Sequence, residues 1–273
     1  MTIVAGSVAA ISCNDQNTKS EKTASTDSTA TKIKEDSISY NLKGVNYKGF
    51  VVYDASKKDK RPAVLVVHEW WGLNDYSRMR AKQLAELGYI AMAVDMYGDG
   101  KTAADPQAAQ ALSSPFYNDP QMAKERFDAA YNKLKEYPET DPSNMAAIGY
   151  CFGGSIVLNV AKMGADLKGV VSFHGILQGV PPDKNLTKAQ FLICHGAADK
   201  FVPKEQVDAF KHSMDSAGVK YTFKAYPDAL HAFTNPASTE NGKKFNIPIA
   251  YNEAADKASW NDMKDFFNKL FSK

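Results

Sequence analysis

Residues 147–155 read Ala147-Ile148-Gly149-Tyr150-Cys151-Phe152-Gly153-Gly154-Ser155, and this stretch decides the fold. An apolar strand is predicted to end at Ile148, and a nearly all-apolar helix is predicted to follow Cys151. The three glycines allow backbone angles and close approaches that a Cβ atom would block. The turn therefore lifts the Cys151 side chain to the helix N-terminus. Unpaired N–H groups and the positive helix end favour a thiolate and a developing oxyanion there.

The turn has two interpretations. Its spacing, G-x-C-x-G-G, is a cysteine version of the G-x-S-x-G nucleophile elbow, in which a strained turn exposes a reactive side chain. The alternative is a structural cysteine in a glycine-rich connection, because cysteine is often buried. The turn alone leaves both open, so residues elsewhere in the chain must decide.

Predicted strands and helices alternate along most of the chain. Strands are expected at residues 37–43, 46–53, 63–67, 89–94, 145–148, 169–173, 191–194 and 221–226. Helices are expected at residues 75–87, 121–137, 152–163, 203–217 and 253–271. Residues 99–119 should form a loop or short helix, and residues 234–251 should belong to a long loop. Such alternation predicts an α/β fold, a mostly parallel sheet with helices on both faces.

The composition is typical of a soluble globular protein. The 273 residues are 44% hydrophobic and carry a formal net charge of +2, which gives no basic field for nucleic acid. No apolar run approaches the roughly 20 residues that span a bilayer. The three cysteines (Cys13, Cys151 and Cys194) cannot all pair and show no zinc-ligand spacing. We therefore expect no disulfide framework, metal or cofactor.

The N-terminal residues are expected to lie outside the folded domain. Residues 1–12 are mostly small or apolar, and Ala10-Ile11-Ser12-Cys13 resembles a bacterial lipobox, where a signal segment is cut before a lipid-bearing cysteine. Residues 13–36 are polar and predict a disordered tether, and residues 37–273 the domain. A lipoprotein on the periplasmic side of the cell envelope is the favoured interpretation. No Lys or Arg precedes the apolar run, so a cytoplasmic protein with a disordered N-terminus stays open.

Four chemically capable side chains follow predicted strands, at the edge where parallel sheets bind ligands. Glu69 follows the strand that ends at Val67, and Cys151 follows the strand that ends at Ile148. Asp199 and His231 follow two later strands. A cysteine nucleophile needs a base, and the base needs an acid to orient it. A solvated histidine and an aspartate favouring a helix start are the separate alternatives, but together the residues predict catalysis.

The remaining histidines and Cys194 are assigned structural roles. We expect His68 and His195 to hydrogen-bond to backbone groups at strand ends, and His212 to face solvent. His174 also follows a strand, but the sequence suggests no partner for it. Cys194 lies within an apolar strand and should be an inert core thiol.

Beyond these separate residues, the chain resembles the dienelactone hydrolase family of α/β-hydrolases. The resemblance rests on Gly149-Tyr150-Cys151-Phe152-Gly153-Gly154, Asp199 with Val202-Pro203, His231-Ala232-Phe233, His68-Glu69-Trp70-Trp71-Gly72-Leu73-Asn74 and Asp95-Met96-Tyr97. It implies an α/β-hydrolase fold and cleavage of an ester or lactone by Cys151, with His231 as base and Asp199 orienting it. It also implies that Glu69 lies beside the thiol and takes part in its activation. The resemblance further implies oxyanion donors at the N–H groups of Phe152 and Trp70, and substrate contacts at Trp71 and Tyr97.

Two departures from the family pattern bear on the substrate. Members that cleave dienelactone carry arginines for the substrate carboxylate, but the corresponding segments here read Gly98-Asp99-Gly100-Lys101 and Asn235. Lys101 could supply a point charge but not a bidentate clamp. We therefore expect a different substrate. A thiol-dependent acyltransferase or peptidase remains an alternative, as does a non-catalytic, lipid-anchored binding protein of the cell envelope.

Overall fold

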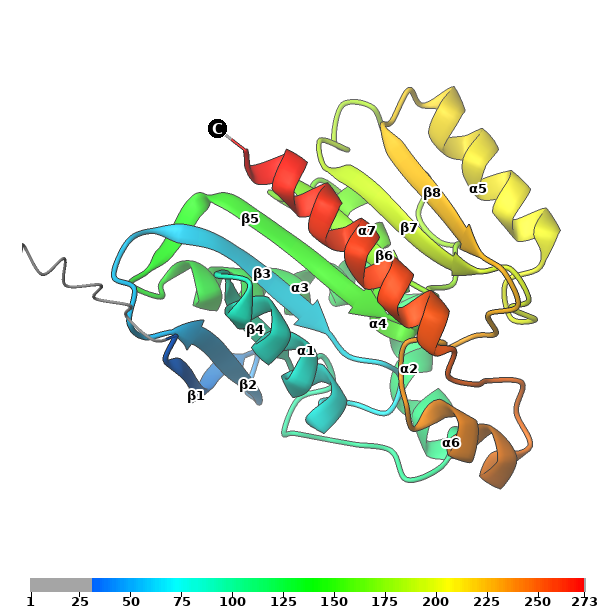
Figure 1. Cartoon of the computed structure of the whole chain (residues 1–273), viewed down its shortest axis with the longest axis horizontal. Coiled ribbons are helices and arrows are strands. Elements are labelled where there is room, and N and C mark those ends of the chain that lie inside the picture. Colours follow the sequence, from blue (N-terminus) through cyan, green and yellow to red (C-terminus); the bar gives the residue numbers. More distant parts are fainter. Residues whose placement is uncertain (1–30, 273) are drawn as a thin grey trace, which may run out of the picture. The chain divides into compact units, whose positions relative to one another are not determined.

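A computed structural model describes residues 31–272, which contain an eight-stranded sheet (Figure 1). Its order is β1-β2-β4-β3-β5-β6-β7-β8. The strands are β1 (Ile33–Leu42), β2 (Val45–Asp54), β3 (Arg61–Val67), β4 (Ile90–Val94), β5 (Thr140–Tyr150), β6 (Gly169–Phe173), β7 (Gln190–Gly196) and β8 (Tyr221–Tyr226). β3 to β8 run parallel, while β1 and β2 form an antiparallel hairpin at one edge. The predicted mostly parallel sheet is confirmed.

Helices cover both faces of this sheet, as Figure 1 shows. They are α1 (Asp75–Glu86), α2 (Pro106–Asn118), α3 (Pro120–Lys135), α4 (Phe152–Lys162), α5 (Lys204–Ser216), α6 (Ser238–Phe245) and α7 (Glu253–Phe271). α1 and α7 pack on one face, and α2 to α5 pack on the other. Among the described helices, none is long and apolar enough to cross a membrane.

The central strand β3 shows why the sheet needs two covered faces. Ala63, Leu65 and Val67 belong to the core beneath α3 and α4, while Val64 and Val66 belong to the core beneath α1 and α7. All five are fully buried. A strand that is apolar on both sides is stable only between two layers of helices.

Several elements differ from the prediction, and β5 begins at Thr140 rather than Met145. β1 begins at Ile33 rather than Ser37, because its polar residues pair with β2 along an exposed edge. Residues 99–119 contain the full helix α2, which Asp105 caps by accepting a hydrogen bond from the Ala108 N–H at 2.8 Å. The predicted long loop contains α6. The predicted signal segment and most of the predicted tether lie outside the described residues.

Candidate active site

The carboxyl ends of β3, β5, β7 and β8 bring Glu69, Cys151, Asp199 and His231 to one edge of the sheet. The distance from His231 Nε2 to Cys151 Sγ is 3.1 Å, and the distance from His231 Nδ1 to Asp199 Oδ2 is 2.8 Å. The structure thus places the predicted nucleophile, base and acid in one hydrogen-bonded row. Glu69 lines the same cavity as Cys151.

Cys151 occupies a strained turn between β5 and α4. Its φ and ψ are 52° and −113°, outside the regions that L-residues favour. A Cβ atom on Gly149 would lie 2.1 Å from the carbonyl oxygen of Gly153, and one on Gly153 would lie 2.3 Å from that of Val67. These glycines are therefore required by contact between backbones. The close approaches that the sequence analysis predicted for these glycines are thus confirmed.

Asp199 is held by two hydrogen bonds, one to each carboxylate oxygen. Its Oδ1 accepts from the Phe201 N–H at 2.8 Å, while Oδ2 faces His231. It does not cap the following helix, because the residue at the start of α5 is Pro203. The alternative that Asp199 serves a helix start is therefore wrong.

His231 lies between Asp199 and Cys151 in this row and is buried. Burial disfavours the imidazolium, but the Cys151 sulfur and the Asp199 carboxylate stabilise it more. Together they raise the pKa of His231 to about 10. At neutral pH the arrangement therefore favours a positive ring against the sulfur.

Glu69 is buried at the end of β3, with 2% of its surface exposed. Burial raises its pKa to about 7, although a hydrogen bond from Asn235 and the charges of His231 and Arg80 oppose the shift. The distance from Asn235 Nδ2 to Glu69 Oε2 is 2.6 Å. Glu69 thus bonds to the neutral amide at a position where the sequence lacked a family arginine.

The two predicted oxyanion donors come from different segments, Phe152 from the start of α4 and Trp70 from the loop after β3. Phe152 is the first residue of α4, so its N–H lacks a partner within the helix. The Gly153 N–H is already used, because it donates to the carbonyl of His68 at 3.0 Å. Trp70 lines the cavity, and its carbonyl accepts from the Tyr97 hydroxyl at 2.9 Å.

Tyr97 is not among the residues that line the cavity. Its side chain is buried, and its hydroxyl donates to the Trp70 carbonyl, so its contact with substrate stays a prediction. Trp71 does line the cavity, where its ring packs against Phe245 of α6. Lys101 is exposed and pairs with Asp99 at 3.5 Å, so it supplies no charge to the wall.

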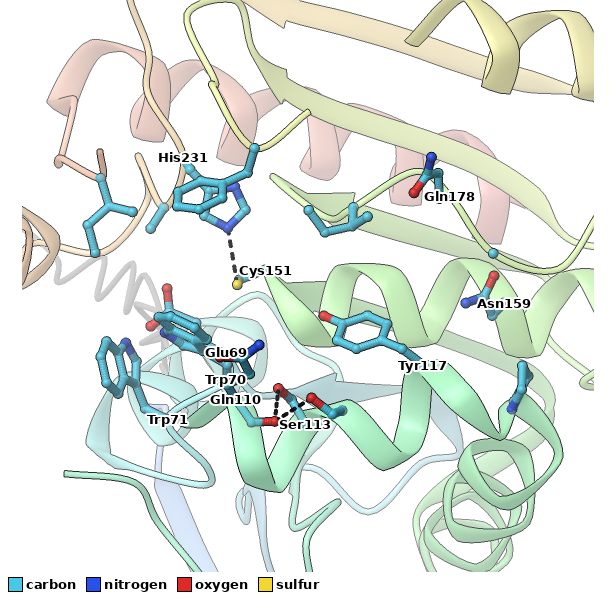
Figure 2. A pocket seen from close by; sticks show the side chains of 17 residues that line it. Glu69, Trp70, Trp71, Gln110, Ser113, Tyr117, Cys151, Asn159, Gln178 and His231 are labelled. Atoms are coloured by element: carbon cyan, nitrogen blue, oxygen red, sulfur yellow. Dashed lines mark hydrogen bonds between the residues drawn. The ribbon is translucent and has the colours of Figure 1, made fainter. Parts of the chain in front are cut away.

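Figure 2 shows the cavity, which has a volume of about 640 Å³. The row of Cys151 and His231 lies between the tryptophans at one end and two amides, Asn159 and Gln178, at the other. Helix α2 forms a further wall, with Tyr117 extending toward the centre. An elongated substrate can therefore place its middle at the sulfur.

His174 is a site residue that the sequence analysis did not identify. Its Nδ1 accepts a hydrogen bond from the Cys151 backbone N–H at 3.1 Å, and its Nε2 lies 2.7 Å from Thr234 Oγ1. Burial, with the charges of His231 and Arg80, holds its pKa well below the usual range. The missing signal was strand order: only the pairing of β5 with β6 places His174 beside the turn.

The other predicted structural residues behave as follows. His68 bonds to backbone groups at both ring nitrogens, at 2.5 Å to the Glu69 carbonyl and 3.2 Å to the Met96 N–H, as predicted. His212 is exposed, and Cys194 is a buried thiol whose pKa burial raises to about 12, so both predictions are confirmed. The ring of His195 packs near Phe223, and its backbone hydrogen bond stays a prediction.

Known proteins share this arrangement of elements. The model of the dienelactone hydrolase family matches residues 49–271. A candidate carboxymethylenebutenolidase of Aquifex aeolicus is 28% identical over 72% of this chain and 86% of its own. A crystal structure of a dienelactone hydrolase-like promiscuous phosphotriesterase from metagenomic libraries is 33% identical, covers 88% of this chain and 99% of that chain, and has a TM-score of 0.82. The acylaminoacyl peptidase of Pyrococcus horikoshii, at 15% identity, covers 90% of this chain and 43% of its own; its TM-score of 0.66 shows the fold alone.

Proposed function

The chain belongs to the dienelactone hydrolase family, and from that premise we propose that it hydrolyses an ester or lactone through a thioester at Cys151. The observation that supports this most strongly is the row of Asp199, His231 and Cys151, joined at 2.8 and 3.1 Å inside a cavity. A nucleophile, a base and an orienting acid in contact are the parts that acyl transfer requires.

In the first half of the reaction His231 takes the proton of the Cys151 thiol, and the resulting thiolate attacks the carbonyl carbon. The carbonyl π electrons move to oxygen, and the N–H groups of Phe152 and Trp70 stabilise the resulting oxyanion. Removal of one such donor typically costs about 3 kcal/mol of transition-state stabilisation. The intermediate then collapses, the carbon–oxygen bond of the ester breaks, and His231 gives its proton to the leaving alkoxide.

In the second half, water attacks the thioester. His231, now neutral, takes the proton from water, and Asp199 keeps the ring oriented through Nδ1. The new oxyanion uses the same two N–H groups. Cleavage of the carbon–sulfur bond releases the carboxylic acid and returns the sulfur to its starting state, so that the enzyme is unchanged after each turnover.

Glu69 controls the thiol in this scheme. A carboxylate near Cys151 disfavours a thiolate, and the pKa of Glu69 near 7 places this influence in the neutral range. Deprotonation of Glu69 above that pH should slow alkylation of Cys151 relative to a variant without the charge. Glu69→Gln should therefore remove an inflection near pH 7 from the rate of alkylation by iodoacetamide; an unchanged inflection contradicts this role.

The experiment that tests the hydrolase combines kinetics with mass spectrometry. Cys151→Ala should abolish turnover of 4-nitrophenyl acetate, while the unaltered chain should show a transient mass increase equal to one acetyl group at Cys151. Cys194→Ala is the matched control, because that thiol is buried in the core. Full activity in Cys151→Ala contradicts the proposal.

The alternative of acyl transfer or peptide cleavage uses the same thioester with another acceptor or donor. Adding hydroxylamine or a simple alcohol during ester turnover separates the possibilities. A hydrolase forms mainly the free acid in water, whereas an acyltransferase forms mainly the amide or the new ester. Cleavage of a blocked peptide would instead indicate a peptidase.

Hydrolysis of a neutral phosphotriester is a second candidate activity. It is favoured by the 33% identity to the promiscuous phosphotriesterase and by a cavity wall that, within residues 31–272, contains neither lysine nor arginine. Paraoxon turnover that disappears in Cys151→Ala would support it. Stoichiometric, lasting phosphorylation of Cys151 would show that the triester is an inhibitor rather than a substrate.

The N-terminal segment supports a separate proposal about location. Ala10-Ile11-Ser12-Cys13 and the polar residues that follow favour a lipid on Cys13, a tether and a place at the periplasmic side of the cell envelope. Fractionation of cells that make the chain should find it with the membranes, and Cys13→Ser should move it to the soluble fraction. A soluble protein in both cases contradicts the tether.

A further inference from the structure

The cavity wall has an unusual charge distribution. Among the described residues, those that line the cavity include no lysine and no arginine. Lys101 pairs with Asp99 and does not line the cavity, and Arg80 binds the Thr234 carbonyl at 2.8 Å and pairs with Asp256. Among the described residues that line the cavity, no lysine or arginine is therefore available to bind a substrate carboxylate.

The ionisable groups that do face the cavity are Glu69, Tyr117, Cys151 and His231, and burial raises the pKa of Tyr117 so that its hydroxyl stays neutral. The His231 imidazolium is the positive group, and the Asp199 carboxylate lies 2.8 Å from its Nδ1. Glu69 adds negative charge as pH rises through its pKa of about 7. An anion placed near the sulfur would meet these carboxylates and lose its hydration, which disfavours binding.

The two ends of the cavity offer different contacts to a neutral molecule. At one end the rings of Trp70 and Trp71 pack edge to face, with centroids 5.0 Å apart. At the other end Asn159 is 7% exposed, and its Oδ1 accepts from the Val180 N–H at 3.1 Å. The Asn159 side-chain N–H groups remain to donate to a ligand. Figure 2 shows Cys151 between the two ends.

We propose that the substrate is an uncharged, elongated ester or lactone. Its apolar part lies on Trp70 and Trp71, its reacting carbonyl lies at Cys151, and a hydrogen-bond acceptor lies at Asn159. This substrate class rests on the proposed hydrolase activity. It separates this chain from enzymes that recognise a lactone through a carboxylate and an arginine.

The charge preference of the cavity is measured without turnover. Iodoacetamide and iodoacetate alkylate thiols by the same displacement of iodide and differ in charge. The ratio of their rates at Cys151 should exceed the ratio for N-acetylcysteinamide by about tenfold, which corresponds to about 1.4 kcal/mol. Peptide mapping assigns the label to Cys151. A ratio equal to or smaller than that of the free thiol overturns the proposal.

Turnover tests the same preference with a matched pair of esters. The methyl ester of 4-nitrophenyl hydrogen glutarate should have a kcat/KM at least about tenfold above that of the free acid at pH 7.5. Gln178→Lys adds a cation at the exposed amide end and should narrow this ratio, whereas Gln178→Met should not. Equal or better turnover of the anion overturns the neutral substrate class. If neither ester shows turnover that depends on Cys151, the proposed hydrolase activity is contradicted instead. The ratio of alkylation rates then still tests whether the cavity prefers a neutral molecule to an anion.

The acceptor site at Asn159 is tested by Asn159→Asp, which keeps an oxygen for the Val180 N–H but removes the side-chain donor. The Michaelis constant for the methyl glutarate ester should rise about fivefold, within the range for loss of one hydrogen bond. The hexanoate ester of 4-nitrophenol has a similar length and no distal acceptor, so its Michaelis constant should change less than about twofold. Equal changes for the two esters contradict an acceptor site at this position.

Discussion

Two loops each place a buried histidine beside Cys151, and the pKa values of these two histidines are shifted in opposite directions. His231, after β8, faces the sulfur through Nε2, whereas His174, after β6, accepts from the Cys151 backbone N–H. Their ring centroids are 5.3 Å apart. The pKa of His231 is raised to about 10, and that of His174 is held well below its usual range.

The partners of the two rings explain the difference. Both rings are buried, which by itself favours the neutral form. His231 has the Cys151 sulfur and Asp199 as partners, and these two groups overcome the effect of burial. His174 has a hydroxyl, Thr234 Oγ1, and feels the positive charges of His231 and Arg80. The comparison teaches that the charge of a neighbour, rather than depth in the protein, decides which histidine can exchange protons at neutral pH.

The largest effect should follow loss of the charged ring itself. His231→Gln removes the base and the proton donor to the leaving group, so kcat/KM for a 4-nitrophenyl ester should fall on the order of 10⁵-fold. Steady-state kinetics with active-site titration measures the loss. A fall of less than about 100-fold would place the proton transfer on another group.

A somewhat smaller loss should follow removal of the charge that distinguishes the two histidines. Asp199→Asn keeps the shape of the side chain but leaves His231 with an amide partner, much as His174 has a hydroxyl. We expect kcat to fall about 10⁴-fold, as for loss of the orienting acid in other triads. The matched control is Asp228→Asn, which changes an exposed aspartate in the loop between β8 and His231. Equal activity of the two variants contradicts the role of Asp199.

His174 should matter for position rather than for proton transfer. The Cys151 N–H donates both to His174 Nδ1 and to the Phe173 carbonyl, at 3.1 and 3.0 Å. His174→Gln removes the first acceptor and should lower kcat about tenfold with little change in KM. His174→Asn retains an oxygen near the place of Nδ1 and suits the φ of 42° at this residue, so it should restore most of kcat. The pH dependence of kcat should be the same in both variants. A shifted profile would indicate that His174 titrates during turnover.

The smallest effects, about 1.4 kcal/mol per pH unit at most for each histidine, concern stability. Because the folded pKa of His174 lies below 6.5, the unfolded chain binds more protons in acid, and His174 lowers the free energy of unfolding as pH falls below about 6.5. Because the folded pKa of His231 is about 10, its stabilisation is complete below 6.5 and is lost as pH rises toward 10. Urea unfolding at several pH values should show a weaker acid loss in His174→Asn and a weaker alkaline loss in His231→Gln than in the unaltered chain. Identical profiles contradict both assignments.

Much of the fold and the central row of the site could be predicted from the sequence. The continuous apolar strand at residues 63–67 requires two layers of helices, and the glycine-rich turn identifies the position of Cys151. Asp199 and His231 could be predicted because parallel strands end at a common edge. Each of these inferences used the residue pattern of one short segment, together with the rule that parallel strands end at a common edge of the sheet.

What could not be predicted depends on contacts between distant segments. The partner of His174 depends on the neighbour of β6, and the position of Tyr97 depends on how deeply the end of β4 is buried. The partner of Glu69 is Asn235, which the chain places far away in sequence. Helix α2 carried a visible signal, Asp105 followed by Pro106, that the glycine and proline content of the region obscured.

The order of the strands has a consequence for biosynthesis. The elbow that presents Cys151 is complete once β5 and α4 have formed, whereas the acid arrives with β7 and the base only after β8. A ribosome-bound chain that ends before residue 231 therefore contains Cys151 but lacks the imidazole that lies 3.1 Å from its sulfur in the folded domain. The contact between Cys151 and His231 can form only after almost the entire domain has been synthesised.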